Sequence, residues 1–242
     1  MKERLQKVLA KRGVSSRRQA EELMLQGSIT VNGKIVRELG TKVDPDVDAI
    51  LVNGKPLPPP PCFTYIALNK PRGFVTTLRD PQKRPIVVSL LQDVPVRVYP
   101  VGRLDMDTEG LLLLTNDGEL SWKLQHPRFK VMKIYEAEVK GIPGEKALDQ
   151  LRTGVFVDER KTLPARLKVL KRREHSTLLE MGIREGRKRQ VKKMCAAVGH
   201  PVISLRRTAI DDIRLGDLAA GQYRHLRPAE LERLKRHLDN QD

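Results

Sequence analysis

The chain has 242 residues, with 46 Lys and Arg against 30 Asp and Glu, so its formal net charge at pH 7 is +16. This length suits two modest domains, and such an excess of cations favours a polyanionic partner, because each neutralised phosphate releases condensed counterions. No apolar run approaches the roughly 20 residues of a membrane span, no apolar segment follows the charged N-terminal residues, and the two cysteines are far apart, so we expect no membrane partner, no structural zinc site and a cytoplasmic location.

The first predicted elements are two helices. Leu5, Val8 and Leu9 recur at helical spacing, which predicts a short helix near the N-terminus. Ser16 and Gln19, three residues apart, predict a capping box, in which each side chain accepts a hydrogen bond from the other residue's backbone. A second helix is therefore expected to begin directly after Ser16.

Short strands are predicted after these helices. The segment SITVNGKIV contains Asn-Gly at residues 32–33, a strong signal for a type I′ hairpin, and a second VNGK follows. The run KPLPPPPC cannot continue a sheet ladder and favours an extended polyproline II conformation. We therefore predict a domain over residues 1–57, a stiff linker over 58–62 and a second domain over 63–242.

The second domain mixes strands with a few helices. FTYIALNKP and KIYEAEVKG alternate like strands, whereas GLLLLT and HSTLLEMGI are predicted as more deeply buried strands. Helices are predicted at residues 119–126, 144–153, 188–198 and 228–239. Because strands and helices do not alternate regularly, the pattern indicates an α+β protein: a small N-terminal α/β domain, then a domain on a mixed, mostly antiparallel sheet with flanking helices.

Basic residues gather first in the N-terminal domain. Residues 1–61 hold eleven Lys and Arg against seven acids, and most of the acids fall late in this segment. The stretch RLQKVLAKRGVSSRRQAEELMLQGSITVNGKIV resembles the S-four-type RNA-binding domain over roughly residues 2–57. The resemblance implies a structured RNA stem-loop, bound mainly through phosphates, shape and 2′-hydroxyls. The candidate contacts on the two predicted helices are Arg4, Lys7, Arg17 and Arg18.

Two further basic clusters follow. Residues 160–173 hold seven Lys and Arg and no acid, and no motif assigns them or the last predicted helix a role. Residues 184–207 hold eight Lys and Arg and one acid. In this second cluster GIREGRKRQVKKM follows a strand and opens a helix, which places cations and free backbone N–H groups at a helix start. Such a start suits a phosphate-bearing ligand.

One stretch is acidic: GRLDMDTEGLLLL places Asp105, Asp107 and Glu109 directly before four leucines. DMDTEG begins like a calcium loop, but the twelfth position counted from Asp105 is Asn116 instead of Glu, so no metal is expected. A glycosidase-type carboxylate pair needs a separation that the sequence does not give, and Arg103 pairing with an Asp would be purely structural. Alternatively, a carboxylate beside apolar residues and a cationic helix acts as a nucleophile.

The motifs favour this last interpretation. VGRLDMDTEGLLLLTNDGEL resembles the signature of the RsuA-type pseudouridine synthases. LNKPRGFVTT, KIYEAEV, and EGRKRQVKKM with LRR resemble three more motifs of that family, in the family's order. The chain is most similar to the RluB-like branch, which acts on large-subunit ribosomal RNA. The resemblance implies an isomerase that detaches uracil from C1′ of a uridine in RNA, rotates it and rejoins it through C5, without cofactor or metal.

The resemblance also implies residue roles. Asp105 matches the nucleophile, although attack on the ribose and attack on the uracil ring both stay open. Tyr135 matches the tyrosine that packs on the flipped base, and Lys192 matches the basic residue that pairs with the catalytic Asp. The predicted RNA contacts in this domain are Arg103, Arg187, Arg189, Gln190 and Lys70. Asp107 and Glu109 are predicted to be structural or hydrogen-bonding. A monomer is expected.

The sequence leaves two alternative functions open. The first is the same isomerisation on small-subunit ribosomal RNA, because specificity lies in RNA shape at the site. The second is a non-catalytic RNA-binding protein of ribosome assembly, which would account for the charge and the N-terminal domain but not for the set of Asp, Tyr and Lys positions. The sequence identifies neither the target nucleotide nor whether free RNA or an assembly intermediate is the substrate.

Overall fold

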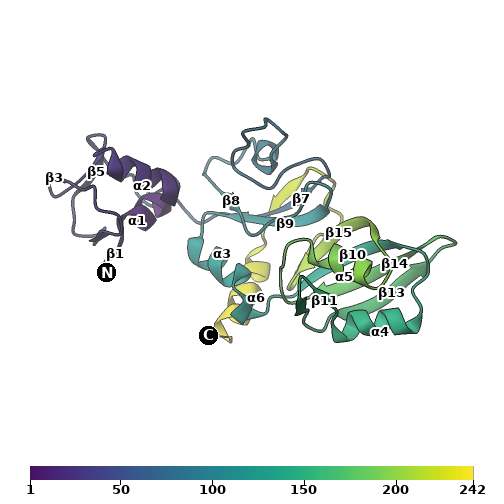
Figure 1. The fold of residues 1–242 in the computed structure, drawn as a ribbon. Helices are drawn as coiled ribbons and strands as arrows, with labels where there is room; N and C mark the ends of the chain where they lie inside the picture. Colours follow the sequence, from purple (N-terminus) through teal and green to yellow (C-terminus); the bar gives the residue numbers. More distant parts are fainter. Residues whose placement is uncertain (242) are drawn as a thin grey trace. The chain divides into compact units, whose positions relative to one another are not determined.

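The computed structural model describes residues 1–241 and divides into two compact units (Figure 1). The first unit comprises Met1–Thr64 together with residues 95–97 and 116–118. The second contains the remaining described residues. Within the described residues no helix is both long and apolar enough to cross a membrane.

The first unit contains two helices and six short strands. Its helices are α1 (Leu5–Lys11) and α2 (Arg17–Leu25). Four strands form a sheet in the order β3-β2-β5-β6, with bounds Lys34–Ile35, Ile29–Val31, Ile50–Val52 and Lys55–Pro56. A separate pair joins β1 (Glu3–Arg4) to β4 (Lys42–Val43). Leu5, Leu9 and Met24 are fully buried in one cluster, so both helices contribute to a single small core.

Local sequence signals act in this unit as predicted. The capping box between Ser16 and Gln19 is present, with both hydrogen bonds at 3.1 Å, and α2 starts directly after it. Asn32 and Gly33 both have positive φ, 51° and 79°, as a type I′ turn requires, and they connect β2 to β3. The hairpin prediction is therefore confirmed.

The second unit is built on a nine-stranded sheet. Its main path runs β13-β14-β10-β15-β9-β7-β17, with bounds Arg166–Arg172, Ser176–Ile183, Lys133–Lys140, Val202–Ile210, Glu109–Thr115, Tyr65–Lys70 and Tyr223–His225. β16 (Ile213–Arg214) pairs with β15, and β8 (Tyr99–Pro100) pairs with β9. β15 and β9 are parallel, and the other strand pairs of this sheet among the described residues are antiparallel. The predicted mixed, mostly antiparallel sheet is confirmed.

Four α-helices accompany this sheet: α3 (Gly118–Gln125), α4 (Glu145–Thr153), α5 (Gln190–Ala197) and α6 (Pro228–Asp239). Short 3-10 turns span Val87–Leu90 and Pro127–Phe129, and β11 (Phe156–Val157) forms a hairpin with β12 (Arg160–Lys161). Each predicted helix is present with both ends within two residues. The helix predicted from residue 188 begins at Gln190, because Arg189 has a φ of 55° and lies outside the right-handed helical region.

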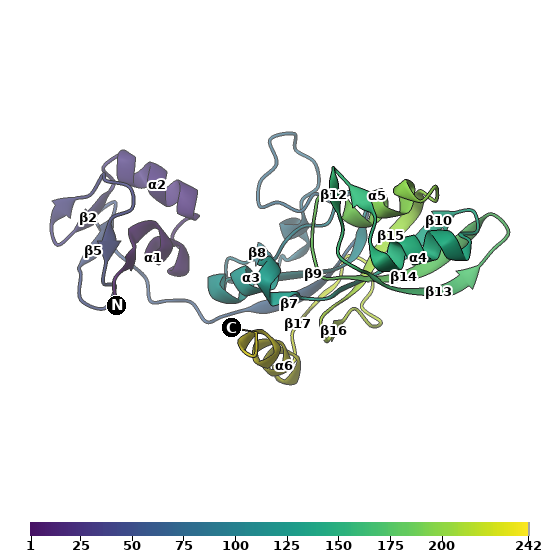
Figure 2. The ribbon, with the colours of Figure 1, turned by 60° about the horizontal axis from the view of Figure 1, so that its bottom comes forward.

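The helices cover the sheet unevenly. α4 and α5 lie along one face of the β13-β14-β10-β15 part (Figure 2). Cys195 of α5 contacts Met181 of β14 at 3.6 Å, and Met181 is the cross-strand partner of Tyr135. Directly opposed residues project to the same face of a sheet, so Tyr135 lies on the face that α5 covers.

The leucine run explains the rigidity of β9. Leu111 and Leu113 join a core cluster with residues of α3 and α6, whereas Leu112 and Leu114 project to the opposite face and are buried too. Burying each leucine stabilises the fold by about 1.5–3 kcal/mol. The acidic segment before β9 is therefore attached to a strand that is fixed on both faces.

The last helix is secured by a partly buried ion pair. Arg224 of β17 donates two hydrogen bonds to the Glu230 carboxylate at 2.7 and 2.8 Å, and Glu230 also accepts from the Arg227 backbone at 2.9 Å. The hydrogen bond from Arg224 is the largest cause that lowers the pKa of Glu230 below its usual value. Ionised Glu230 therefore stabilises the native state above its unfolded-state pKa, and this stabilisation is lost as the pH falls through the lowered native pKa.

We expect Glu230→Gln to lower the free energy of unfolding at pH 7 by about 2 kcal/mol, because charge-assisted hydrogen bonds are lost. The difference from wild type should begin to shrink as the pH falls below the unfolded-state Glu pKa of about 4.3, and it should be lost as the pH falls through the lowered native pKa. Urea unfolding at several pH values measures both effects. Glu232→Gln on the same helix is the control, because its pair with Arg236 is exposed and should contribute under 1 kcal/mol. Equal losses in the two variants would contradict the assignment.

Candidate active site

One cavity of the second unit gathers most of the predicted catalytic-domain residues. Its volume is about 1020 Å³. Its wall is formed by residues 101–105 and Thr108, by β10 and β15, by the end of β14 and by the following loop to the start of α5. The predicted residues that line it are Arg103, Asp105, Tyr135, Arg187, Arg189 and Gln190. The sequence motifs that carry these residues are far apart in the chain, and the sheet brings them together.

Asp105 lies in the short segment that leads into β9. The backbone of this segment is held on its inner side by Thr76, whose hydroxyl donates to the Leu104 carbonyl at 2.7 Å and accepts from the Leu104 N–H at 3.2 Å. The Asp105 side chain itself is half-buried at the cavity wall. Its position is therefore fixed through backbone contacts, which leaves the carboxylate available for a ligand.

Lys70 supplies most of that backbone support. Its ammonium group donates to the carbonyls of Asp105 at 3.0 Å, Thr108 at 2.8 Å and Pro71 at 3.0 Å. Burial lowers the pKa of Lys70 to about 8, while the nearby carboxylates of Asp107 and Asp105 act in the opposite direction.

The prediction that Lys70 contacts RNA is wrong. Lys70 is fully buried, and its three N–H donors already have acceptors within the protein. The side chain lies at the end of β7 with its ammonium group under the acidic segment, so it is a structural support for Asp105. The Lys-Pro motif carries no information on the direction of the side chain.

Tyr135 and Arg207 face each other across β10 and β15. Tyr135 is 8% exposed and Arg207 3% exposed. The Arg207 guanidinium carbon lies 5.9 Å from the Tyr135 ring centroid, and Nη1 donates a long hydrogen bond of 3.4 Å to the Tyr135 hydroxyl. Lys133, two residues before Tyr135 on the same face of β10, also lines the cavity.

Burial, together with the smaller effect of the Arg207 charge, lowers the pKa of Lys133 to about 8. Sequence reasoning placed neither Lys133 nor Arg207 among the site residues. The two-residue spacing from Tyr135 could have indicated Lys133. The burial of Arg207 has no local sequence signal.

The predicted ion pair between Lys192 and Asp105 is absent. Lys192, on α5, instead pairs with Asp107 at 2.5 Å, and this hydrogen bond is the largest cause that lowers the pKa of Asp107. Asp107 lies on the exposed side of the acidic segment, where α5 reaches it, whereas the Asp105 carboxylate lines the cavity. The pair with Lys192 agrees with the predicted structural or hydrogen-bonding role of Asp107. Glu109 lies 3.6 Å from Arg72 in a partly exposed ion pair, and its role stays a prediction.

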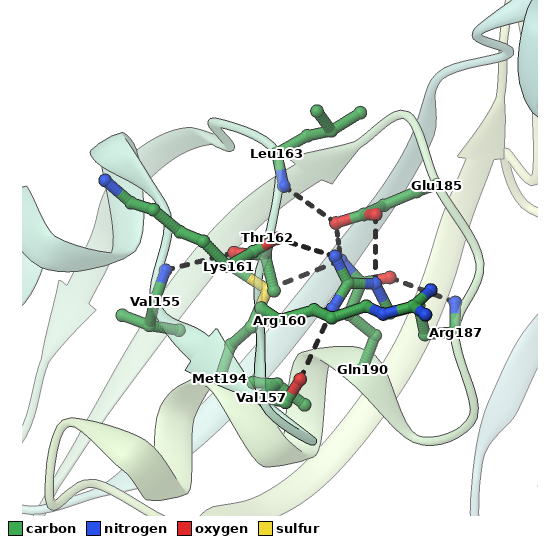
Figure 3. Close-up of polar contacts among 10 residues, drawn as sticks. All are labelled: Val155, Val157, Arg160, Lys161, Thr162, Leu163, Glu185, Arg187, Gln190 and Met194. Atoms are coloured by element: carbon green, nitrogen blue, oxygen red, sulfur yellow. Dashed lines mark hydrogen bonds and ion pairs between the residues drawn. The ribbon is translucent and has the colours of Figure 1, made fainter.

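Arg187 and Gln190 are engaged within the protein (Figure 3). The Glu185 carboxylate accepts from Arg187 Nε at 3.2 Å, from Gln190 Nε2 at 2.5 Å and from the Leu163 backbone at 2.9 Å. Gln190 Oε1 in turn accepts from the Arg187 backbone at 3.1 Å. Gln190 is buried at the cavity wall, and its amide group is hydrogen-bonded within the protein, so its contact with RNA stays a prediction.

The Arg187 guanidinium also holds the β11–β12 hairpin. Its Nη atoms donate to the backbone carbonyls of Val157 at 3.3 Å, Arg160 at 3.1 Å and Lys161 at 2.7 Å. The side chain is 28% exposed and lines the cavity. Its hydrogen bonds fix the hairpin beside the cavity, and its contact with RNA stays a prediction.

The other predicted RNA contacts remain accessible. Arg103 and Arg189 are exposed and line the cavity. In the first unit the four predicted cations are exposed as well: Arg4, Lys7, Arg17 and Arg18. Arg4 ends β1 and precedes α1 instead of lying on the helix, and Lys7 pairs with Glu3 at 2.9 Å. Their contacts with RNA stay predictions.

The cavity combines a carboxylate with a flat aromatic ring and surrounding cations. A carboxylate at a fixed backbone position can form a covalent bond to an electrophilic carbon. A tyrosine ring on the same wall can stack on a base that has left its helix, as enzymes acting on bases require. The cations of the cavity rim favour a phosphate-bearing substrate.

Family comparisons agree with this chemistry. The model of the RNA pseudouridylate synthase family matches residues 64–197, and the model of the S4 domain matches residues 3–48. The chain belongs to the RNA pseudouridine synthase family. It thus joins an isomerase domain to an RNA-binding domain.

Individual relatives match nearly the whole chain. A Bacillus subtilis protein named ribosomal large subunit pseudouridine synthase B is 46% identical over 235 residues, which is 96% of either chain. An Aquifex aeolicus protein named as an uncharacterized RNA pseudouridine synthase is 45% identical over 97% of this chain and 94% of its own. A crystal structure of a pseudouridylate synthase superposes with a TM-score of 0.69 at 31% identity, covering 96% of this chain and 99% of that one.

Proposed function

We propose that this protein isomerises one uridine of large-subunit ribosomal RNA to pseudouridine, with Asp105 as the nucleophile. The observation that carries the proposal is the shared cavity. Asp105 and Tyr135 both line it, together with the exposed cations Arg103 and Arg189. The Bacillus subtilis relative, whose name specifies the large subunit, supports the choice of RNA.

The roles follow from the chemistry of each side chain. Asp105 forms the transient covalent bond, either to ribose C1′ or to the uracil ring. Tyr135 stacks on the flipped base, and Arg103 and Arg189 contact the adjoining RNA. Lys192 neutralises the acidic segment through Asp107. Because Asp105, Tyr135 and Lys192 come from one chain, a monomer suffices, and an rRNA substrate implies a cytoplasmic site of action.

The reaction releases the hydrogen of uracil C5, which gives a direct assay. Large-subunit rRNA transcribed with tritium at that carbon is incubated with the protein, and tritium in the solvent is counted. About one equivalent per RNA is expected, and carbodiimide mapping then locates the modified nucleotide. Release from small-subunit RNA alone would keep the chemistry and change the substrate. Tight binding without release from either RNA would favour a non-catalytic assembly protein.

We further propose that residues 1–57 capture the RNA, after which 58–62 connect them to the catalytic domain of 63–242. Replacing Arg17 and Arg18 by Gln should weaken binding to full-length rRNA and reduce the slope of log affinity against log salt by about 2, because two phosphate contacts are lost. The maximal rate should stay within about twofold. Filter binding at several salt concentrations measures the slope.

The control replaces Lys42 and Lys55 by Gln, which removes the same charge from exposed strand positions of the same unit. Its slope should change by less than half as much. If both double variants change the slope equally, the unit attracts RNA through net charge and not through the start of α2.

A further inference from the structure

Arg207 is a buried cation whose hydrogen bonding is incomplete. Its Nε donates to the Leu111 carbonyl at 2.7 Å, and its Nη1 makes the long contact with the Tyr135 hydroxyl. Its Nη2 is buried and has no partner among residues 1–241. A guanidinium does not give up its proton in proteins, and a buried charged donor without an acceptor is costly.

Arg207 lies on β15, between β10, which contains Tyr135, and β9, which follows Asp105 in the chain. It is paired with Tyr135 of β10 on one side and with Gly110 of β9, five residues after Asp105, on the other. It also lines the cavity that Asp105 and Tyr135 share. An acceptor that enters this cavity can therefore reach the guanidinium.

A second buried polar atom points to the same conclusion. Thr108 lines the cavity, and its hydroxyl oxygen is buried without a hydrogen-bond partner within the described chain. Lys133 adds a further cation to the wall. This part of the cavity is thus rich in donors and fits a ligand with several acceptor oxygens, such as the uracil ring.

We propose that Arg207 binds the flipped uracil, with Nη2 donating a hydrogen bond to a carbonyl oxygen of the ring while Nη1 positions Tyr135. This inference rests on the proposed function. It assigns Arg207 two tasks at once, substrate contact and orientation of the stacking ring, and it explains why the fold retains an incompletely bonded charge at this position.

The Arg207 hydrogen-bond donor can assist the reaction whether Asp105 attacks the ribose or the uracil ring. If Asp105 attacks C1′, the N1–C1′ bond breaks and its electron pair spreads over the uracil carbonyl oxygens. If Asp105 attacks ring carbon C6, the electron pair moves into an enolate at O4. In both routes the N1–C1′ bond breaks, the C5–C1′ bond forms, the bond to Asp105 breaks again to restore its carboxylate, C5 loses a proton and N1 gains one. A fixed cationic donor at a carbonyl oxygen stabilises the negative charge that develops in either route.

The rotation of the base also suits a single fixed donor. A half-turn about the axis through C6 and N3 exchanges N1 with C5 and O2 with O4. The oxygen that faces Arg207 before the rotation is therefore replaced by the other carbonyl oxygen afterwards. Arg207 would keep the detached ring in the cavity through both orientations.

The test combines a protein variant with altered RNA. Single-turnover rates are measured for wild type, Arg207→Lys and the control Arg206→Lys, using a target stem-loop that carries uridine, 2-thiouridine or 4-thiouridine at the modified position. We expect Arg207→Lys to lower the uridine rate about 100-fold, with RNA affinity and circular dichroism unchanged. Arg206 projects to the opposite face of β15, so its variant should keep the wild-type rate.

The thio-substituted RNAs separate a substrate contact from a structural role. Sulfur accepts hydrogen bonds poorly, so at least one thiouridine should react about tenfold slower with wild type, and this difference should vanish in Arg207→Lys. If the rate losses caused by Arg207→Lys and by sulfur substitution multiply, the inference is overturned. It is also overturned if wild type converts both thiouridines at the uridine rate. If Arg207→Lys fails to fold, the wild-type rates with the thiouridines alone decide. Inactivity of wild type on every uridine RNA would defeat the proposed function instead.

Discussion

Asp105→Asn is expected to abolish pseudouridine formation while leaving the fold and RNA binding nearly intact. The amide has no negative charge and is a poor nucleophile, so the rate should fall by at least about 10⁴-fold. The fold should survive because Lys70 is held by the backbone carbonyl of residue 105 and not by its side chain. Tritium release from C5-labelled rRNA measures the rate of isomerisation. Thermal unfolding measures the stability of the fold, and filter binding measures the affinity for RNA.

Glu109→Gln is the matched control for this variant. It removes one negative charge from the same segment, where Glu109 makes only a partly exposed ion pair with Arg72. Its rate should stay within about threefold of wild type, as expected for loss of a surface pair. Turnover by Asp105→Asn at a rate close to that of the control would show that the carboxylate is not the nucleophile.

Gly110→Ala is expected to separate β9 from β15 and so to disable the site. Gly110 has a φ of 105°, and an added Cβ would lie 2.2 Å from the Arg207 carbonyl oxygen and 2.7 Å from its nitrogen. These are backbone atoms, so relief requires the two parallel strands to move apart. Backbone strain and overpacking together should cost about 3–5 kcal/mol of unfolding free energy.

The catalytic rate of Gly110→Ala should fall at least about 100-fold, because Arg207 and the acidic segment are displaced together. Urea unfolding and single-turnover rates measure the two effects. Gly199→Ala is the control, since Gly199 also has positive φ, 86°, but has nothing near the position of an added Cβ. Its cost should be about 1 kcal/mol. A similar loss in both variants would show that only φ matters at residue 110.

The predictions from sequence succeeded where local patterns determine structure. The capping box at Ser16 and the Asn-Gly turn at residue 32 depend on neighbouring residues alone, and both are present. The leucine run of β9 could be identified as buried because no polar residue interrupts it. The motifs also placed Asp105 and Tyr135, which the sheet brings into one cavity.

The errors concern the direction of charged side chains. Lys70 was predicted to contact RNA, yet it is buried because backbone carbonyls supply its hydrogen-bond partners. VISLRRTAI was not predicted as a strand, since two arginines interrupt its apolar pattern. In the sheet they project to opposite faces, so Arg207 is buried while Arg206 is partly exposed. Only the pairing of β15 with both β10 and β9 reveals this.

The parallel pairing of β15 with β9 has a consequence for the order of events during synthesis. The Arg207–Leu111 hydrogen bond joins residues 96 positions apart, so the loop-closure entropy must be overcome before this contact can form. The strands and helices of the first unit, by contrast, are complete by Pro56. Because the N-terminal part leaves the ribosome first, the growing chain acquires its affinity for RNA well before it can catalyse. Chains that terminate before residue 207 would thus occupy RNA without modifying it and would compete with the full-length enzyme.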